Sequence, residues 1–269
     1  MDRLASLPMY NWPELQLQTD QWWRVLARCF AAEGLCDVPA ELKGFDNPYD
    51  DWRHPHLLMS QTCGYPLRHE YREMLTVIAV PRYNAEGCEG SDYCSMVVVR
   101  KNDGHLTLAD FNGRRAAFNG EDSQSGYSAL RAVIAPLAQG GSFFSQTVKT
   151  GAHLKSMAAV VANEADICAI DCVGWELAKR LFPDLVARLR VIAQTPSAPA
   201  LPYVTARSCA HDELQRLRRG LLRAVEDKEH SDLRAQLLID GFDLLPQSAY
   251  ARIEKIEKAA IDAGYPELI

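Results

Sequence analysis

A short segment rich in glycine and serine, residues 120–126, carries the side chains with the clearest chemistry. It follows an apolar run at 115–118 and leads into an amphipathic stretch, which predicts a turn between a strand and a helix. The first N–H groups of a helix lack intrahelical partners and carry the positive end of the helix dipole. Ser123 and Ser125 add hydroxyl donors, and Gly126 lets a ligand approach the backbone closely. The segment predicts an anion-binding turn; the alternative, that Ser123 or Ser125 only caps the helix, stays open.

Two further junctions between an expected strand and an expected helix carry polar side chains. His153 stands at the start of one helical stretch, where it could donate to an anion, although an isolated histidine is more often structural. Asp171 directly follows the apolar run 167–170. Ligands of open α/β sheets collect at the carboxyl ends of the strands, so three such junctions together predict one site.

The usual signatures of catalysis and metal binding fail. The sequence has neither the glycine–lysine phosphate loop nor the three-glycine dinucleotide turn, and Ser123 lacks the glycine spacing of a hydrolase nucleophile. No carboxylate or thiol pattern completes a metal site around His54, His56 or His69. We therefore predict no catalytic residue, no metal and no cofactor.

Short apolar runs alternate with amphipathic stretches along most of the chain, which favours α/β layers with largely parallel sheets. The expected strands are 7–10, 56–60, 75–80, 93–99, 115–118, 147–149, 167–170, 189–193 and 203–206. The expected helices run from Thr19 to Gly34 and lie around 127–137, 154–161 and 173–181. The C-terminal third is expected to be mostly helical, over 214–225, 233–238 and 250–256.

Composition excludes several protein classes. The 269 residues are 48% hydrophobic and 24% charged, enough apolar material for a core and too much for a disordered chain. The net charge of −6, without a basic block, argues against nucleic acid as a partner. The longest nearly apolar stretch, around 157–170, is interrupted by charged residues, so no membrane span is expected.

The eight cysteines contain no Cys-x-x-Cys pair, and most stand in apolar or helical patterns, which favours reduced thiols. A link between Cys88 and Cys94 stays open. The N-terminus lacks a cationic region followed by an apolar run. We therefore expect a cytoplasmic protein if Met1 is the native start, and a periplasmic one if a signal peptide has been removed.

The sequence resembles the substrate-binding proteins of phosphate, phosphite and phosphonate ABC transporters over nearly its whole length. The segments that carry the resemblance are 57–66, 93–99, 119–127 with its Asp-Ser-Gln-Ser-Gly-Tyr core, 150–153 and 159–167. The resemblance implies a bilobal periplasmic-binding fold of the second type, with two α/β lobes that close on a ligand in a cleft. Residues 1–93 and 194–269 would form the first lobe, and residues 94–193 the second.

The resemblance also implies which residues bind the ligand. The family's Ser-Thr-Ser-Gly turn, which holds the phosphonate oxygens, falls on Ser123, Gln124, Ser125 and Gly126; a family histidine falls on His153 and a tyrosine on Tyr93. Asp171, Tyr10 and Gln61 complete the predicted set.

Two departures from the family pattern bear on the ligand. Gln124 replaces the compact threonine of the turn. The two carboxylates that hold the ammonium group of aminoalkylphosphonates fall near Val173 and Leu201, neither of which can pair with a cation, although the nearby Asp171 can substitute in part. A smaller or apolar-tailed oxyanion is preferred.

Two functions follow from the resemblance. The first is a solute-binding protein for a phosphate-like or phosphonate-like oxyanion in transport or sensing, with an ABC transporter permease as a possible partner. The second is an enzyme on the same bilobal fold, similar to proteins that make the thiamine pyrimidine. The matched segments offer no nucleophile–base pair or cofactor lysine, since Lys149 and Lys155 lie near His153 only in sequence. Binding is therefore favoured over catalysis.

Overall fold

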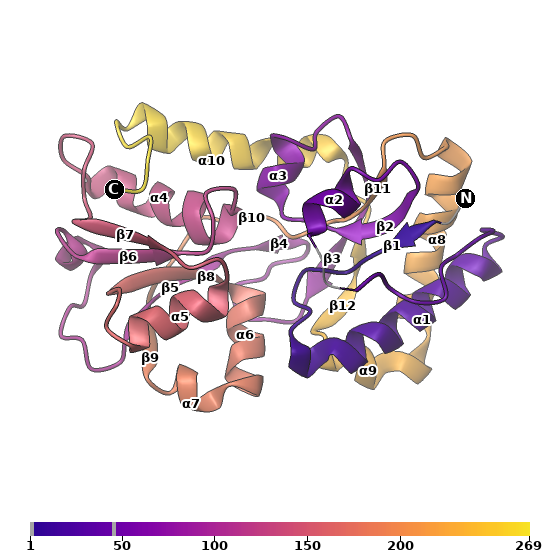
Figure 1. The fold of residues 1–269 in the computed structure, drawn as a ribbon, viewed down its shortest axis with the longest axis horizontal. Coiled ribbons are helices and arrows are strands. Elements are labelled where there is room, and N and C mark those ends of the chain that lie inside the picture. Colours follow the sequence, from indigo (N-terminus) through magenta and orange to yellow (C-terminus); the bar gives the residue numbers. More distant parts are fainter. Residues whose placement is uncertain (1–2, 45–46) are drawn as a thin grey trace. The chain divides into compact units, whose positions relative to one another are not determined.

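The computed structural model describes residues 3–44 and 47–269, which fold into two compact units. Unit 1 comprises the chain up to Asn84 together with Glu89–Ser91 and Pro199–Tyr250. Unit 2 comprises Ala85–Cys88, Asp92–Ala198 and Ala251–Ile269. Both units are α/β structures, and Figure 1 labels their elements.

Unit 1 is built on a five-stranded sheet with the order β1-β2-β11-β3-β12. Its strands are β1 (Leu4–Ala5), β2 (Leu57–Gln61), β3 (Leu75–Tyr83), β11 (Tyr203–Ala206) and β12 (Ile239–Asp243). β1 runs parallel to β2, whereas β11 is antiparallel to both β2 and β3, and β12 is antiparallel to β3. The sheet is therefore mixed.

The helices of unit 1 pack on one another and on this sheet. They are η1 (Pro13–Leu15), α1 (Gln16–Ala32), α2 (Pro48–Trp52), α3 (Gly64–Arg68), α8 (His211–Glu226), η5 (Lys228–His230), α9 (Ser231–Gln236) and η6 (Gln247–Tyr250). α8 packs against α1, β3 and β12. The buried face of α1 carries Trp22, Val25, Leu26 and Phe30, as its spacing predicts.

Unit 2 contains a five-stranded sheet with the order β7-β6-β8-β5-β9. Its strands are β5 (Ser95–Arg100), β6 (Arg115–Phe118), β7 (Gln146–Lys149), β8 (Ile167–Asp171) and β9 (Leu189–Gln194). β6, β7 and β8 are parallel, and β5 is antiparallel to β8 and β9. The carboxyl ends of three strands thus lie at one edge. β4 (Asp92–Tyr93) and β10 (Ala198–Pro199) form a separate two-stranded sheet.

Helices cover both faces of the unit 2 sheet. They are η2 (Leu108–Phe111), a π-helical turn η3 (Gln124–Ser128), α4 (Ala129–Ile134), η4 (Ala135–Leu137), α5 (His153–Val161), α6 (Cys172–Leu181), α7 (Pro183–Val186) and α10 (Ala251–Asp262). Figure 1 shows α4 on one face and α5 with α6 on the other. Leu130 and Ile134 of α4 pack on alternate residues of the strands, among them Val97 and Ala169. This packing fixes where the helices begin relative to the strand ends.

Most of the expected elements are confirmed, including strands 115–118 and 203–206 with their predicted bounds. Two expectations are wrong. The expected strand 7–10 is not found; the strand in this region is Leu4–Ala5, and Tyr10 lies in a turn with a φ of 59°. The C-terminal third is mostly helical as expected, through α8, α9 and α10, and it also contains β12, which pairs with β3 at the edge of the unit 1 sheet. The sheets are mixed rather than largely parallel, since β5 and β11 reverse the strand direction.

The division of the chain also differs from the prediction, which places residues 194–269 in the first lobe. In the structure, residues 251–269 belong to unit 2 because α10 packs on α4. Arg131 of α4 hydrogen-bonds the backbone oxygen of Pro266, and the amides of Phe143 and Phe144 donate to the Ile269 oxygen at 2.7 and 3.0 Å. No helix within the described ranges is long and apolar enough to cross a bilayer.

Candidate functional site

The turn between β6 and α4 has a defined division of roles between its two serines. Ser123 has an extended backbone and its Oγ accepts a hydrogen bond from the Gly126 amide at 3.0 Å, so Ser123 caps the helical run that begins at Gln124. Ser125 does not cap this helix; its Oγ lies 2.9 Å from Nε2 of His153. All three side chains are largely buried in unit 2, since Ser123 and Ser125 are each 6% exposed and His153 is 17% exposed.

His153, which contacts Ser125, also contacts Asp171, and these two residues stand at the starts of α5 and α6. His153 is the first residue of α5, and its Nε2 lies 3.4 Å from Oδ2 of Asp171. Asp171 ends β8 and is the N-cap of α6, where its Oδ1 accepts from the Gly174 amide at 2.7 Å. The contacts among Ser125, His153 and Asp171 therefore bring three helix N-termini to one point at the carboxyl edge of the sheet.

This convergence places the free amides of three helix N-termini beside the Asp171 carboxylate. Each helix N-terminus carries roughly half a positive charge, with outward-pointing amides that can bind oxygen atoms. Burial lowers the pKa of His153, against the opposing effects of the Asp171 carboxylate and the Ala169 backbone. At neutral pH the imidazole is therefore neutral and offers one N–H donor. Helix-end amides, hydroxyl groups and a neutral imidazole are donors suited to an anion.

Gly126 allows the turn to fold closely on itself. A Cβ atom at this position would lie 1.9 Å from Oδ1 of Asn119 and 3.1 Å from Cε1 of His153. Asn119 directly follows β6, and its Oδ1 is buried without a hydrogen-bond partner within the described part of the chain. The predicted site omits Asn119, although its place directly after a strand was a signal that could have identified it.

Tyr10 and Gln61 lie together in unit 1, in the wall of a small cavity of about 30 Å³. Gln61 donates through Nε2 to the Tyr83 hydroxyl at 2.8 Å and to the Leu201 carbonyl at 3.0 Å. Tyr10 meets Tyr83 edge to face, with ring centroids 5.5 Å apart. The left-handed backbone of Tyr10, with a φ of 59°, costs free energy, and such strain is concentrated at functional sites.

The structure thus places the predicted residues in separate groups. Ser123, Gln124, Ser125, Gly126, His153 and Asp171 form one group in unit 2. Tyr10 and Gln61 form a second group in unit 1, together with Tyr83, Tyr203 and Trp22, which the sequence analysis did not select. These three come from distant segments, so no local pattern indicates their association. Tyr93 is buried in β4.

Val173 and Leu201, near which the resemblance places the family's ammonium-binding carboxylates, are both buried. Val173 is 0% exposed near the start of α6, and Leu201 is 7% exposed in unit 1. Neither offers a partner for an ammonium group.

The Ser125–His153–Asp171 contact differs from a catalytic triad. In a triad the hydroxyl and the carboxylate bind opposite ring nitrogens, so that the carboxylate orients the base. Here Ser125 and Asp171 both approach Nε2. The arrangement is suited to holding a ligand rather than to activating a nucleophile.

Comparisons with solved structures show the fold. A binding protein component of an ABC phosphonate transporter from Pseudomonas aeruginosa superposes with a TM-score of 0.75 at 15% identity, covering 97% of this chain and 87% of that one. PhnD1 from Prochlorococcus marinus, solved with methylphosphonate, gives 0.74 at 16% identity, covering 95% and 96%. XAC2383 from Xanthomonas citri, solved with ATP, gives 0.70 at 16% identity, covering 98% of both chains. The fold is that of the periplasmic binding proteins.

A search of the curated proteins gave no match. A family model for the periplasmic substrate-binding protein of phosphonate ABC transporters matches residues 56–250, well over half of the chain. That family consists of solute-binding proteins, so the enzyme alternative is not favoured. The chain belongs to the periplasmic substrate-binding proteins of phosphonate ABC transporters.

Proposed function

We propose that this protein binds a small phosphate-like or phosphonate-like oxyanion at the point where the N-termini of η3, α5 and α6 meet. The observation that carries the proposal is the direct contact of Ser125 with His153 and of His153 with Asp171. Helix-end amides, two serine hydroxyls and a neutral imidazole are suited to a compact, multiply oxygenated anion.

Asp171 favours a ligand that keeps one proton. A carboxylate beside a fully ionised anion is repulsive, whereas a carboxylate that accepts from a P–OH group is attractive. Phosphate and phosphonates retain a proton near neutral pH, and sulfate does not. Asp171 therefore supports discrimination against sulfate.

The substituent on the ligand is proposed to be small or apolar. The positions that would pair with an ammonium group hold the buried Val173 and Leu201. The family further supports delivery of the ligand to an ABC transporter permease, although a sensing role uses the same binding step.

Calorimetric titration of phosphate, phosphite, methylphosphonate, aminoethylphosphonate and sulfate tests the proposal. We expect a phosphorus oxyanion to bind best, with sulfate and aminoethylphosphonate weaker. Ser125→Ala should weaken binding about 10- to 100-fold, since a hydrogen bond to a charged group contributes roughly 1.5–3 kcal/mol.

Ser156→Ala is the matched control. Ser156 is a buried serine of α5 whose Oγ lies 2.7 Å from Oγ1 of Thr150, with no contact to Ser125 or Asp171 among the hydrogen bonds of the described residues. It should bind like the wild type. Equal affinity of Ser125→Ala and wild type, or sulfate as the tightest ligand, would contradict the proposal.

A further inference from the structure

Three cysteines that are far apart in the sequence meet in unit 2. The Sγ atoms of Cys88 and Cys172 lie 3.4 Å apart, and the Cys94 thiol is hydrogen-bonded to Cys172. The Cys172 amide also donates to the Cys94 carbonyl at 2.9 Å. Cys172 is therefore the central thiol, with a neighbour on either side. All three are free thiols in the structure.

Gly87 lets the segment Ala85–Cys88 lie directly on the other two thiols. Its φ of 94° is in the region that favours glycine, and an added Cβ would lie 2.8 Å from Sγ of Cys94 and 3.1 Å from Cβ of Cys172. This segment belongs to unit 2, whereas the residues on both sides of it belong to unit 1. The contact between Cys88 and Cys172 thus holds the segment Ala85–Cys88 against the rest of unit 2.

The three thiols differ in accessibility. Cys172 is 0% exposed and Cys94 is 7% exposed, whereas Cys88 is only partly buried. Hydrogen bonding to Cys172 together with burial raises the pKa of Cys94, and hydrogen bonding to Cys88 together with burial raises the pKa of Cys172. Both buried thiols are therefore protonated and slow to react with an external reagent. Cys88 is the accessible entry point.

We propose that Cys88 and Cys172 form a dithiol–disulfide pair that is oxidised by exchange with a small-molecule disulfide. The Cys88 thiolate first attacks the external disulfide, forms a mixed disulfide and releases one equivalent of free thiol. The Cys172 sulfur then attacks the Cys88 sulfur, forms the intramolecular disulfide and releases the second thiol. The protein loses two electrons and two protons, and the external disulfide gains them.

The resulting bond would join residues 84 positions apart and tie the segment Ala85–Cys88 to the start of α6. That start is one residue beyond Asp171, so oxidation would rigidify the backbone beside the anion site. In a variant without Cys88, Cys94 is the remaining thiol with which Cys172 could form a disulfide. The proposal stands on the thiol contacts and does not depend on the identity of the ligand.

The test is oxidation of the folded full-length chain with oxidised glutathione at mildly alkaline pH, followed by alkylation under denaturing conditions and peptide mapping. We expect two fewer alkylated thiols than the eight of the sequence, with Cys88 and Cys172 in one linked peptide. The melting temperature should rise by about 5–10 °C, because the bond closes a long loop. An oxidised protein in which Cys88 and Cys172 are both still alkylated would overturn the proposal.

Single variants distinguish the attacking role of Cys88 from the resolving role of Cys172. Cys172→Ser should accumulate a glutathione adduct on Cys88 that does not resolve, and Cys88→Ser should leave only slow formation of a Cys94–Cys172 link. The control is Cys36→Ser, which removes an exposed thiol outside the cluster and should oxidise like wild type. Unchanged formation of an internal disulfide in Cys172→Ser would also overturn the proposal, whether or not the anion binds.

Discussion

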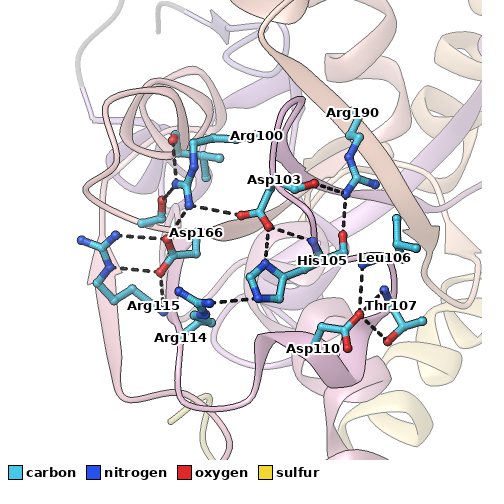
Figure 2. A network of polar contacts seen from close by, with 12 residues as sticks. Arg100, Asp103, His105, Leu106, Thr107, Asp110, Arg114, Arg115, Asp166 and Arg190 are labelled. Carbon is cyan, nitrogen blue, oxygen red and sulfur yellow. Dashed lines mark hydrogen bonds and ion pairs between the residues drawn. The ribbon is translucent and has the colours of Figure 1, made fainter.

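The two ends of β8 carry buried aspartates with opposite surroundings. Asp166, just before the strand, accepts hydrogen bonds from Nη2 of Arg100 at 2.6 Å and from the amide, Nε and Nη2 of Arg115 at 3.0, 3.1 and 3.0 Å. Figure 2 shows this network, which extends through Asp103 to His105 and Arg114. Burial alone would raise the pKa of Asp166, but the bonds from Arg115 and Arg100 outweigh it and hold that pKa far below its usual range.

Asp171, at the other end of the same strand, receives one backbone amide and lies beside His153. No arginine or lysine contacts it in residues 3–44 and 47–269. The comparison separates two uses of a buried carboxylate. At the Asp166 end, guanidinium groups neutralise the carboxylate and tie loops to the sheet. At the Asp171 end, the carboxylate contacts a backbone amide and an imidazole, and we propose that the helix N-termini there bind the ligand.

The largest expected effect is a loss of stability on substitution of Asp166, which directly precedes β8. Asp166→Asn should lower the free energy of unfolding by about 3 kcal/mol, because it leaves Arg100 and Arg115 without their buried partner; both arginines are partly exposed, which limits the loss. Urea unfolding measures it, with Asp184→Asn at an exposed position of α7 as the control. Anion affinity should be unchanged. A weaker anion affinity in the folded Asp166→Asn variant would contradict the comparison.

The same carboxyl predicts a pH dependence. Its pKa is lower in the folded than in the unfolded chain, so its stabilisation is fully present above the unfolded value of about 3.9 and is lost as the pH falls towards the folded value. Wild type should therefore lose stability below about pH 4 more steeply than Asp166→Asn. Parallel acid-unfolding curves for the two proteins would argue against this role.

At the proposed oxyanion site, Gly126→Ala should lower both the free energy of unfolding and the anion affinity. The new methyl group would lie 1.9 Å from Oδ1 of Asn119, and overpacking costs typically 1–3 kcal/mol. Adding Asn119→Ala should restore most of the stability, which thermal unfolding of the single and double variants would show. If the double variant is no more stable than Gly126→Ala, the clash is not the cause.

His153 gives the smallest expected effect, in a different pH range. Burial keeps its folded pKa below the unfolded value of about 6.5, so as the pH falls below that value the unfolded chain binds a proton that the folded chain does not. Stability should therefore decrease as the pH falls from neutral to about 5.5, and the decrease should be smaller in His153→Gln, which lacks this group. Urea unfolding at the two pH values tests this, and an equal decrease in the variant would contradict it.

Most strands and helices could be predicted from the sequence because their apolar spacing is local, whereas β1 and β12 were not predicted. β6 and β11 have their predicted bounds for this reason. The turn at Tyr10 could not, since its left-handed backbone depends on contacts with distant side chains such as Tyr83. The helix starts at Ser125, His153 and Asp171 were predictable one by one, whereas the 2.9 and 3.4 Å contacts among them depend on the order of β6 and β8 in the sheet.

Backbone amide NMR of the isotope-labelled protein, titrated with methylphosphonate, tests the central claim most directly, because it locates the anion. We predict that the largest shifts on binding fall on the amides of residues 124–126 and on the amide and ring of His153, with the amides around Asp166 unchanged. Binding with its largest shifts elsewhere, and none at residues 124–126, would contradict the assignment of the oxyanion site to the end of the sheet that carries Asp171.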